Sequence, residues 1–502
     1  MALFECRRCG KYYPINTSSY ICDCGGHFKL EVPSHSIASN PAKSMWGLGA
    51  VAATLHAVAN QDEEVPRRRD EDRVESSILV DSVMSSPGAV DKFIEKTSIS
   101  LGEGSTPEVT DISISEPNDE VRLKLDFLNP TLSYKDRGSS MLVSAARYFG
   151  VNQAVVDSSG NAAVSLSAYC ARAGIALSVY LPEGTSKSKI AQIKRFGGKV
   201  NAIPGDRSAT SDAILEDLER DHPYYMSHIY NPLFHHGTKS LIYELANSKG
   251  GELPDEIVIP AGNGTLLLGI EIALLELLRS GGLLKVPRVI VVQAKNVAPI
   301  NGLLLERYGI GDTTAMMDNF TDISPSQKEL GLALSPSRYE GVASDITWIK
   351  RLDQISPEIA ATNRITEASK VLNADNPMSN STLAEGIAIP KPPRLEEMAE
   401  VIASRRWPIV VVHEEEIKEA RIRLSLQGVD VEDTAAATYA GAIKWIEYRR
   451  GNDFNAADAT RDGEGSELGE LRDNTAGDTK GHLTVVELTG AGLKSPYSDN
   501  SN

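Results

Sequence analysis

The sequence predicts an α/β fold with more than one domain, from its length and from the order of its patterns. A chain of 502 residues is longer than one ordinary hydrophobic core accommodates. From residue 101 to about residue 450, β-rich runs alternate with helical patterns: VNQAVVDSS precedes AVSLSAYCARAG, ALSVYLPEG precedes SKIAQIKRFGG, and EIVIPAGNG precedes TLLLGIEIALLELLRSGG. This alternation predicts a mostly parallel sheet with helices on both of its faces.

Composition and charge exclude several classes of function. The net charge of −17 argues against nucleic acid as the main partner, because phosphate contacts need clustered Lys and Arg. No apolar run is long enough to span a bilayer, so no membrane partner is expected. The first ten residues, MALFECRRCG, lack the apolar segment of a secretory signal. We therefore expect a cytoplasmic protein.

Residues 1–32 form a cysteine-rich module that resembles a zinc ribbon in its spacing. Cys6 and Cys9 are separated by two residues, and Cys22 and Cys24 by one. Four thiolates on two turns suit a structural zinc ion, which prefers four tetrahedral S or N ligands. The short second pair leaves two alternatives, in which His27 replaces one thiolate or all four cysteines are reduced free thiols.

Residues 452–480 differ in composition from the rest of the chain. The segment is acidic, rich in Gly and poor in large apolar residues, so it cannot bury enough surface to offset its chain entropy. We predict a disordered acidic insertion here. The strand-like run HLTVVELTG follows it and resumes the α/β pattern.

The segment NPTLSYKDRGS, residues 129–139, places Lys135 at the start of a predicted helix, just after a turn that contains Pro130. A lysine that acts as a Schiff-base nucleophile must be held and partly desolvated, so that its neutral amine is available. Taken alone, the pattern also fits a solvated surface lysine, with Asp136 and Arg137 as ordinary charges at a helix start.

Three further segments place small or polar residues at the ends of predicted strands. DSSGNAAVS (157–165) and IPAGNGTLLLG (259–269) each end a strand in a Gly-containing turn and open a helix, whose N-terminus favours anions. LTGAGLK (488–494) ends the last strand with the hydroxyl of Thr489. Each segment alone also fits a plain turn with a helix cap.

Taken together and in this order, these segments resemble the signature of the fold-type II pyridoxal-phosphate (PLP) enzymes, the tryptophan synthase β family. Within that family the sequence is most similar to threonine synthases. LGEGSTP (101–107) and VEDTAAATYAG (431–441) also fall in the order seen there, as does the N-terminal cysteine module. The resemblance covers most of the chain, apart from the acidic segment.

The resemblance implies two three-layer α/β domains behind the cysteine module. The large PLP-binding domain would comprise residues 33–139 and 233–498, and the small domain residues 140–232. Lys135 would form the Schiff base with PLP and later move protons. The other implied residues are Asn161 at the 3′-oxygen of the cofactor, Gly262, Asn263, Gly264, Thr265 and Leu266 around its phosphate, Thr489 at its ring nitrogen, and Ser159, Gly160 and Ala162 at the substrate.

The implied reaction converts O-phosphohomoserine and water to threonine and phosphate by β,γ-elimination and replacement. Some positions depart from the family pattern: Leu132 stands for Gly, Tyr134 for Phe and Ala162 for Thr. Phe234 occupies the place where many members carry an Arg for the substrate phosphate. The nearby histidines 228, 235 and 236 offer another anion site, or are core and capping residues.

Two alternatives to a threonine synthase-like lyase stay open. The first is another fold-type II enzyme acting on a small amino acid: a serine or threonine dehydratase, a cysteate-synthase-like enzyme, or a β/γ-replacement enzyme of specialised metabolism. The second is a non-catalytic protein with the same fold, against which Lys135 and Asn161 both speak. In every enzymatic reading the partner is a small amino-acid substrate, and the resemblance allows a homodimer.

Overall fold

The computed structural model describes residues 3–31, 98–312, 382–459 and 481–492, except positions 15, 16, 18, 206, 222, 280–282, 284 and 310. These residues form three sheets: one of three strands, one of six and one of four. The two larger sheets are flanked by helices, which confirms the predicted α/β class. Residues 32–97 and 460–480 lie outside the described residues, and with them most of the predicted acidic insertion.

The smaller α/β unit is built on a parallel four-stranded sheet in the order β8-β7-β6-β9. Its strands and helices follow one another along the chain as the sequence patterns predict. Its elements are β6 (Gln153–Asp157), α5 (Asn161–Ala173), β7 (Ala176–Pro182), α6 (Lys187–Arg195), β8 (Lys199–Ile203), α7 (Arg207–Asp221) and β9 (Tyr224–Tyr225).

The larger unit has a six-stranded sheet in the order β12-β11-β10-β13-β5-β4, parallel except for its edge strand β4. The last strand in sequence, β13, lies between β10 and β5 in the middle of this sheet, and β10 is buried along its whole length. The strands are β4 (Glu108–Thr110), β5 (Asp119–Lys124), β10 (Glu256–Pro260), β11 (Arg288–Ala294), β12 (Ile409–Val412) and β13 (His482–Glu487).

Helices and short helical turns cover this sheet. The two turns are η3 (Asp126–Leu128) and η7 (Glu385–Ile387). The helices are α9 (Ser240–Ser248), α10 (Thr265–Arg279), α11 (Pro299–Tyr308), α16 (Leu395–Arg405), α17 (Glu414–Leu426) and α18 (Asp433–Ala459). Buried side chains of β10 and β11 alternate between two cores, so each face of the sheet has its own helical layer.

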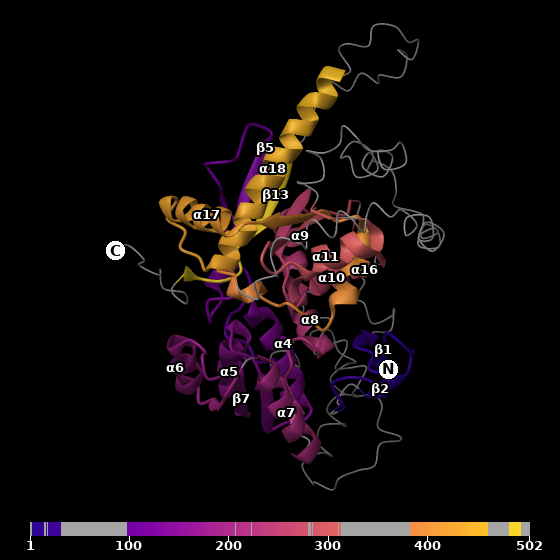
Figure 1. Cartoon of the computed structure of the whole chain (residues 1–502), viewed down its shortest axis with the longest axis vertical. Coiled ribbons are helices and arrows are strands. Elements are labelled where there is room, and N and C mark those ends of the chain that lie inside the picture. The colour runs from indigo at the N-terminus through magenta and orange to yellow at the C-terminus, as the bar shows by residue number, and fades with distance from the viewer. Residues whose placement is uncertain are drawn as a thin grey trace, which may run out of the picture.

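Two helices, α4 (Lys135–Tyr148) and α8 (Pro232–Thr238), lie between the units (Figure 1). They cross at close range, because a Cβ on Gly237 would lie 2.2 Å from the carbonyl oxygen of Arg137, and one on Gly138 would lie 2.3 Å from the Phe234 ring. The predicted domain divisions, after residues 139 and 232, fall at these two helices. The divisions themselves stay predictions.

The cysteine module is a small antiparallel sheet in the order β2-β1-β3, formed by β1 (Leu3–Cys6), β2 (Tyr12–Pro14) and β3 (Phe28–Glu31). Its buried side chains, among them Phe4 and Phe28, belong to the same hydrophobic cluster as α4, α5 and α8. In Figure 1 the module, in indigo, lies beside the body close to α8. It is therefore packed against the α/β body.

The predicted disordered insertion begins too early in the sequence. Helix α18 continues to Ala459, beyond the proposed start at residue 452, and projects past the sheet in Figure 1. Adding residues to an existing helix costs far less than nucleating one, so the polar segment that follows Arg450 extends the helix despite its composition. Residues 460–480 lie outside the described residues.

No helix in the described part of the chain combines the length and the apolar character needed to cross a bilayer.

Candidate active site

Lys135 is the first residue of α4, and the segment before it is fastened to the end of β13. The backbone N–H of Tyr134 donates to the carbonyl oxygen of Thr489 at 3.1 Å, and Ser133 forms a β-bridge with Gly490. Leu132 holds a φ of +64°, a conformation that favours glycine. The turn before α4 therefore keeps the backbone conformation that favours glycine, although Leu132 stands at this position.

The Lys135 amine lies at the start of α10. Its Nζ donates to the Tyr134 hydroxyl at 2.5 Å and to Thr265 Oγ1 at 3.0 Å, and these two hydroxyls lie 2.9 Å apart. The structure therefore brings together the lysine segment and the glycine turn, which are 130 residues apart in sequence. Tyr134, noted only as a departure from the family pattern, is a member of the site.

The turn between β10 and α10 has the geometry of an anion cradle. Gly264 has a φ of +79°, and a Cβ there would lie 2.3 Å from Met398 Sδ. A Cβ on Gly262 would lie 3.0 Å from the Gly386 carbonyl oxygen. The turn is therefore confined to small residues, and it presents the positive N-terminal end of α10.

Asn161 opens α5 on the small unit and reaches across to the large one. Its Nδ2 donates to both carboxylate oxygens of Glu432 at 3.1 Å. Glu432 is buried just before α18, and a Cβ on Gly490 would lie 2.2 Å from its Cδ. Glu432 was missed from sequence. A sequence signal for it is the carboxylate that stands directly before helix α18 in the segment VEDTAAA.

Two buried polar atoms at the predicted cofactor positions lack a hydrogen-bond partner among the described residues. They are Oγ1 of Thr489, whose residue is 1% exposed, and Oδ1 of Asn263. A buried polar atom without a partner costs about 1–3 kcal/mol, so such atoms mark places for a ligand. With the lysine amine and the glycine turn, this set of groups fits PLP, which carries an aldehyde, a phosphate and a ring nitrogen.

The predicted substrate residues lie at the junction of β6 and α5. Ser159 and Gly160 are partly exposed, and a Cβ on Gly160 would meet nothing within 4 Å. Ala162, by contrast, is 2% exposed. Open space is therefore found at Gly160, while the Ala162 methyl faces protein.

The Phe234 position holds no cation. Its ring is fully buried and packs on Gly138, one turn after Lys135. His235 and His236 beside it are buried as well, and burial is the first cause that lowers the pKa of each, that of His236 to about 3. Burial disfavours the charged form of both imidazoles, so these histidines match the alternative interpretation as core residues.

A buried ion network anchors α4 beneath Lys135. Arg137 donates to both oxygens of Asp126, from Nε at 2.7 Å and from Nη2 at 2.6 Å, and Nη1 reaches Glu244 at 2.8 Å. Burial opposes the charge on Asp126, but the neighbouring Arg137 lowers the pKa of this carboxyl to about 2. Because these groups come from η3, α4 and α9, the network fixes where α4 begins.

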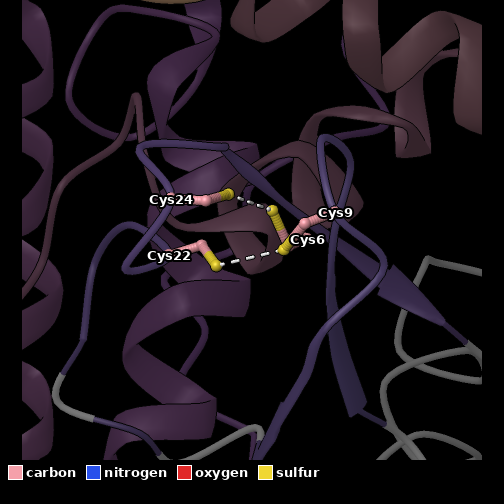
Figure 2. Close-up of side chains that lie close together, drawn as sticks. All are labelled: Cys6, Cys9, Cys22 and Cys24. Atoms are coloured by element: carbon pink, nitrogen blue, oxygen red, sulfur yellow. Dashed lines mark hydrogen bonds between the residues drawn. The ribbon is translucent and has the colours of Figure 1, made fainter.

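The four N-terminal cysteines meet in one cluster (Figure 2). Their Sγ atoms all lie within 4.8 Å of one another, with Cys6 and Cys24 at 3.5 Å and Cys9 and Cys22 at 3.6 Å. Four sulfurs around zinc, at the usual bond length of about 2.3 Å, would be about 3.8 Å apart. This donor set fits zinc.

His27 does not belong to the cluster. Its ring packs against Tyr230 with the ring centroids 5.7 Å apart, and the metal-ligand group consists of the four cysteines alone within the described residues. The one-residue spacing of Cys22 and Cys24 is accommodated by the tight turn at Gly25, whose φ is +78°. A fourth ligand from histidine is therefore unnecessary.

Comparisons with known proteins relate part of the chain to PLP-dependent enzymes. A family model described as "Pyridoxal-phosphate dependent enzyme" matches residues 99–334. Threonine synthase of Methanocaldococcus jannaschii is 28% identical over 301 residues, which are 59% of this chain and 67% of that protein. Threonine synthase of Mycobacterium tuberculosis is 31% identical over 207 residues, 41% of this chain and 57% of that protein. The match thus spans little more than half of the mycobacterial relative.

A solved structure of the processed form of threonine deaminase isoform 2 from Solanum lycopersicum shares the fold. It aligns with a TM-score of 0.51, covers 85% of this chain and 86% of its own, and is 15% identical. At that identity the likeness concerns the fold alone. Members of the matched family bind PLP and act on small amino-acid substrates. Residues 99–334 thus match the family of pyridoxal-phosphate dependent enzymes, and part of the chain is similar to threonine synthases.

Proposed function

We propose that the protein is a lyase that converts O-phosphohomoserine and water to threonine and phosphate. The observation that carries the proposal is the position of the Lys135 amine, which lies 3.0 Å from Thr265 at the glycine turn. This geometry supports a lysine that serves the cofactor and the substrate in one place. The similarity to threonine synthases supports the choice of substrate.

When bound, PLP supplies an electron sink for charge that develops on the substrate α-carbon. The chain's own residues bind, orient and move protons. The turn at 262–265, with the first turn of α10, would hold the phosphate; Asn161 would face the 3′-oxygen and Thr489 the ring nitrogen. The hydroxyl of Thr489 is a weak acid and would leave that nitrogen mostly unprotonated, which suits elimination and replacement.

Lys135 is the proton carrier in this proposal. Its Nζ would accept the proton from the substrate α-carbon and later return it, since it stays beside the reacting carbons. Tyr134 and Thr265 would orient the amine through the hydrogen bonds that they make with it. Open space at Gly160 lies where the substrate carboxylate would bind.

The test is to incubate purified enzyme with O-phosphohomoserine and to measure phosphate and threonine together. We expect both products in equal amounts. The Lys135→Ala variant should lose turnover and also the visible absorbance band of lysine-bound PLP. If that band persisted in the variant, the lysine assignment would be wrong. If the wild type released no phosphate, the proposed substrate would be wrong.

A second candidate function is favoured by Phe234. Its buried ring stands where many relatives carry an arginine, and the buried histidines beside it are neutral. A substrate without a phosphorylated side chain would suit this environment, as in a serine or threonine dehydratase. Keto-acid formation from serine or threonine, in place of phosphate release, would establish this alternative.

We further propose that the cysteine cluster holds one structural zinc ion. The four sulfur atoms support it by their distances. A zinc assay on purified protein should find about one equivalent, and a Cys9→Ser variant less.

A homodimer and a cytoplasmic location stay proposals. The second is supported by the five described cysteines, among which there is no disulfide.

A further inference from the structure

Arg394 links the cysteine module to the rest of the protein. The residue is 1% exposed and precedes the first residue of α16. Its guanidinium makes four hydrogen bonds: to the carbonyl oxygens of Ile229 at 2.7 Å, Tyr230 at 2.9 Å and Phe28 at 3.3 Å, and to Glu397 Oε2 at 2.7 Å. A buried guanidinium must have its donors satisfied, so these segments are held together as a unit.

On the module side, the contacts lie next to the cysteines. Phe28 is the strand partner of Cys6, and a Cβ on nearby Gly26 would lie 2.4 Å from Cys6 Sγ. Arg7 follows Cys6 and forms an ion pair with Glu397 at 3.0 Å. Glu397 is thus shared by Arg394 and Arg7. A change in the position of the cysteine turns would act directly on this pair.

On the body side, one route from Arg394 leads to the glycine turn. The N–H of Met398 donates to the Arg394 carbonyl oxygen at 3.0 Å, in the first turn of α16. The Met398 thioether packs against Gly264, so closely that a Cβ there would lie 2.3 Å from Sδ. Gly264 therefore packs against Met398 of α16, the helix that Arg394 directly precedes.

A second route leads to the lysine helix. Ile229 and Tyr230, which accept from Arg394, precede Asn231, and the Asn231 side chain caps α8 by accepting from the N–H of Leu233 at 3.0 Å. Helix α8 then packs on α4 at the Gly237 crossing. Both the 262–265 turn and the helix that carries Lys135 are thus connected to Arg394, the turn through its main-chain carbonyl and the helix through its guanidinium.

We propose that Arg394 is a positioning residue that couples metal binding in the four-cysteine module to PLP binding at the 262–265 turn. The inference rests on the proposed cofactor and metal, but not on the identity of the substrate. Coupling between two binding sites is reciprocal: the factor by which zinc strengthens PLP binding must equal the factor by which PLP strengthens zinc binding. Metal-loaded protein binds PLP more tightly than metal-stripped protein.

The experiment uses the full-length protein in zinc-loaded and chelator-stripped forms. The dissociation constant of PLP is measured in each by titration of the visible absorbance band, and zinc release to a chromogenic chelator is measured with and without PLP. Couplings of this kind are typically about 5- to 150-fold, so we expect zinc removal to weaken PLP binding at least about fivefold. The zinc affinity should change by the same factor when PLP is removed.

Variants locate the coupling. Arg394→Met keeps the length of the side chain and removes its donors, and it should bring the two PLP dissociation constants close together. Arg7→Gln, at a side chain 38% exposed, is the milder change and should lower the ratio without unfolding the protein. Lys11→Gln is the matched control: Lys11 also forms an ion pair within the module, with Asp23 at 2.6 Å, but among the described residues it has no such pair with the body.

The outcomes separate this inference from the proposed function. Equal PLP dissociation constants with and without zinc would overturn the coupling and leave the PLP enzyme intact. An unchanged ratio in both Arg394→Met and Arg7→Gln would overturn the role of Arg394. Protein that bound PLP but never retained zinc would remove the metal and the coupling together. Failure to bind PLP in any form would overturn the proposed function as well.

Discussion

At the scale of single residues, the site is defined by polar atoms whose partners lie in distant parts of the chain. Lys135 bonds to Thr265, Asn161 to Glu432, and the backbone of Tyr134 to Thr489. Hydroxyls and amides were visible in the sequence as motif members, but their pairing was not. The carboxylate of Glu432 shows this most clearly, because only the fold brings it to Asn161.

Removal of the buried Thr489 hydroxyl should stabilise the protein without PLP but weaken PLP binding. Thr489→Val keeps the shape and removes a hydroxyl that has no partner among the described residues. We expect the protein without PLP to gain about 1 kcal/mol in its free energy of unfolding, while PLP binding weakens about fivefold. Urea unfolding and titration of the visible band measure the two effects.

Thr438→Val is the control for this substitution. Thr438 is equally buried, but its hydroxyl donates to the Thr434 carbonyl oxygen at 3.1 Å. The control should lose stability by about 1 kcal/mol and leave PLP binding unchanged. Equal losses of stability in both variants would show that the Thr489 hydroxyl is satisfied within the protein.

At the scale of secondary-structure elements, the close crossing of α4 and α8 positions Lys135. The crossing depends on two glycines, Gly138 facing the Phe234 ring and Gly237 facing the backbone of Arg137. A ring can shift slightly, whereas a backbone carbonyl in a packed helix cannot. Gly237 is therefore the more demanding of the two positions.

Substitution of Gly237 by alanine should separate the two helices. The new Cβ would lie 2.2 Å from the carbonyl oxygen of Arg137, so we expect a loss of about 1–3 kcal/mol or more in the free energy of unfolding, with weaker PLP binding. Gly302→Ala in α11 is the control, since a Cβ there meets nothing within 4 Å. The control should be neutral or stabilising by up to about 1 kcal/mol. A tolerated Gly237→Ala would contradict the tight crossing.

The histidines of α8 make an acid-dependent contribution to stability. Burial, together with the charge of Lys239, lowers the pKa of His236 to about 3, although Glu276 acts in the opposite direction. Between pH 6.5 and about 3 the unfolded chain therefore binds a proton that the folded chain does not. The free energy of unfolding falls as the pH falls through this range, by up to about 1.4 kcal/mol per pH unit for each such histidine.

The prediction is tested with His236→Asn, whose amide cannot titrate. Urea unfolding at pH 7.5, 6.0 and 5.0 should show a shallower loss of stability in the variant than in the wild type. Glu487, whose pKa burial raises, acts in the opposite direction but is present in both proteins, so the difference isolates His236. Parallel pH profiles would indicate that His236 becomes charged within the fold.

At the scale of the whole molecule, the last described strand, β13, is inserted into the middle of the large sheet. β13 lies between β10 and β5, so a segment that follows residue 480 completes the middle of the large sheet and brings Thr489 to Lys135. The cysteine module is joined to the body through Arg394 and through a shared hydrophobic cluster. The last strand therefore contributes to the site, and the cysteine module packs against the body that carries the site.

The acidic segment between α18 and β13 is expected to be dispensable. Deletion of residues 461–478, joined by a short Gly-Ser linker, removes charged and small residues that the sequence predicts to be unable to form a core. We expect unchanged PLP binding and a change in unfolding free energy below about 0.5 kcal/mol. Loss of the visible band would show that this segment contributes to the site.

The sequence alone determined the features that depend on neighbours in the chain. Alternating strand and helix patterns predicted the α/β class, glycine-containing segments at strand ends predicted tight turns that open helices, and the cysteine spacing predicted the thiol cluster, because each of these is a local property. The tertiary structure alone decided what depends on distant contacts: the pairing of Glu432 with Asn161, the burial of the α8 histidines, the length of α18 and the contacts of Arg394. Burial and charge pairing arise only when remote segments pack together, so no local pattern encodes them.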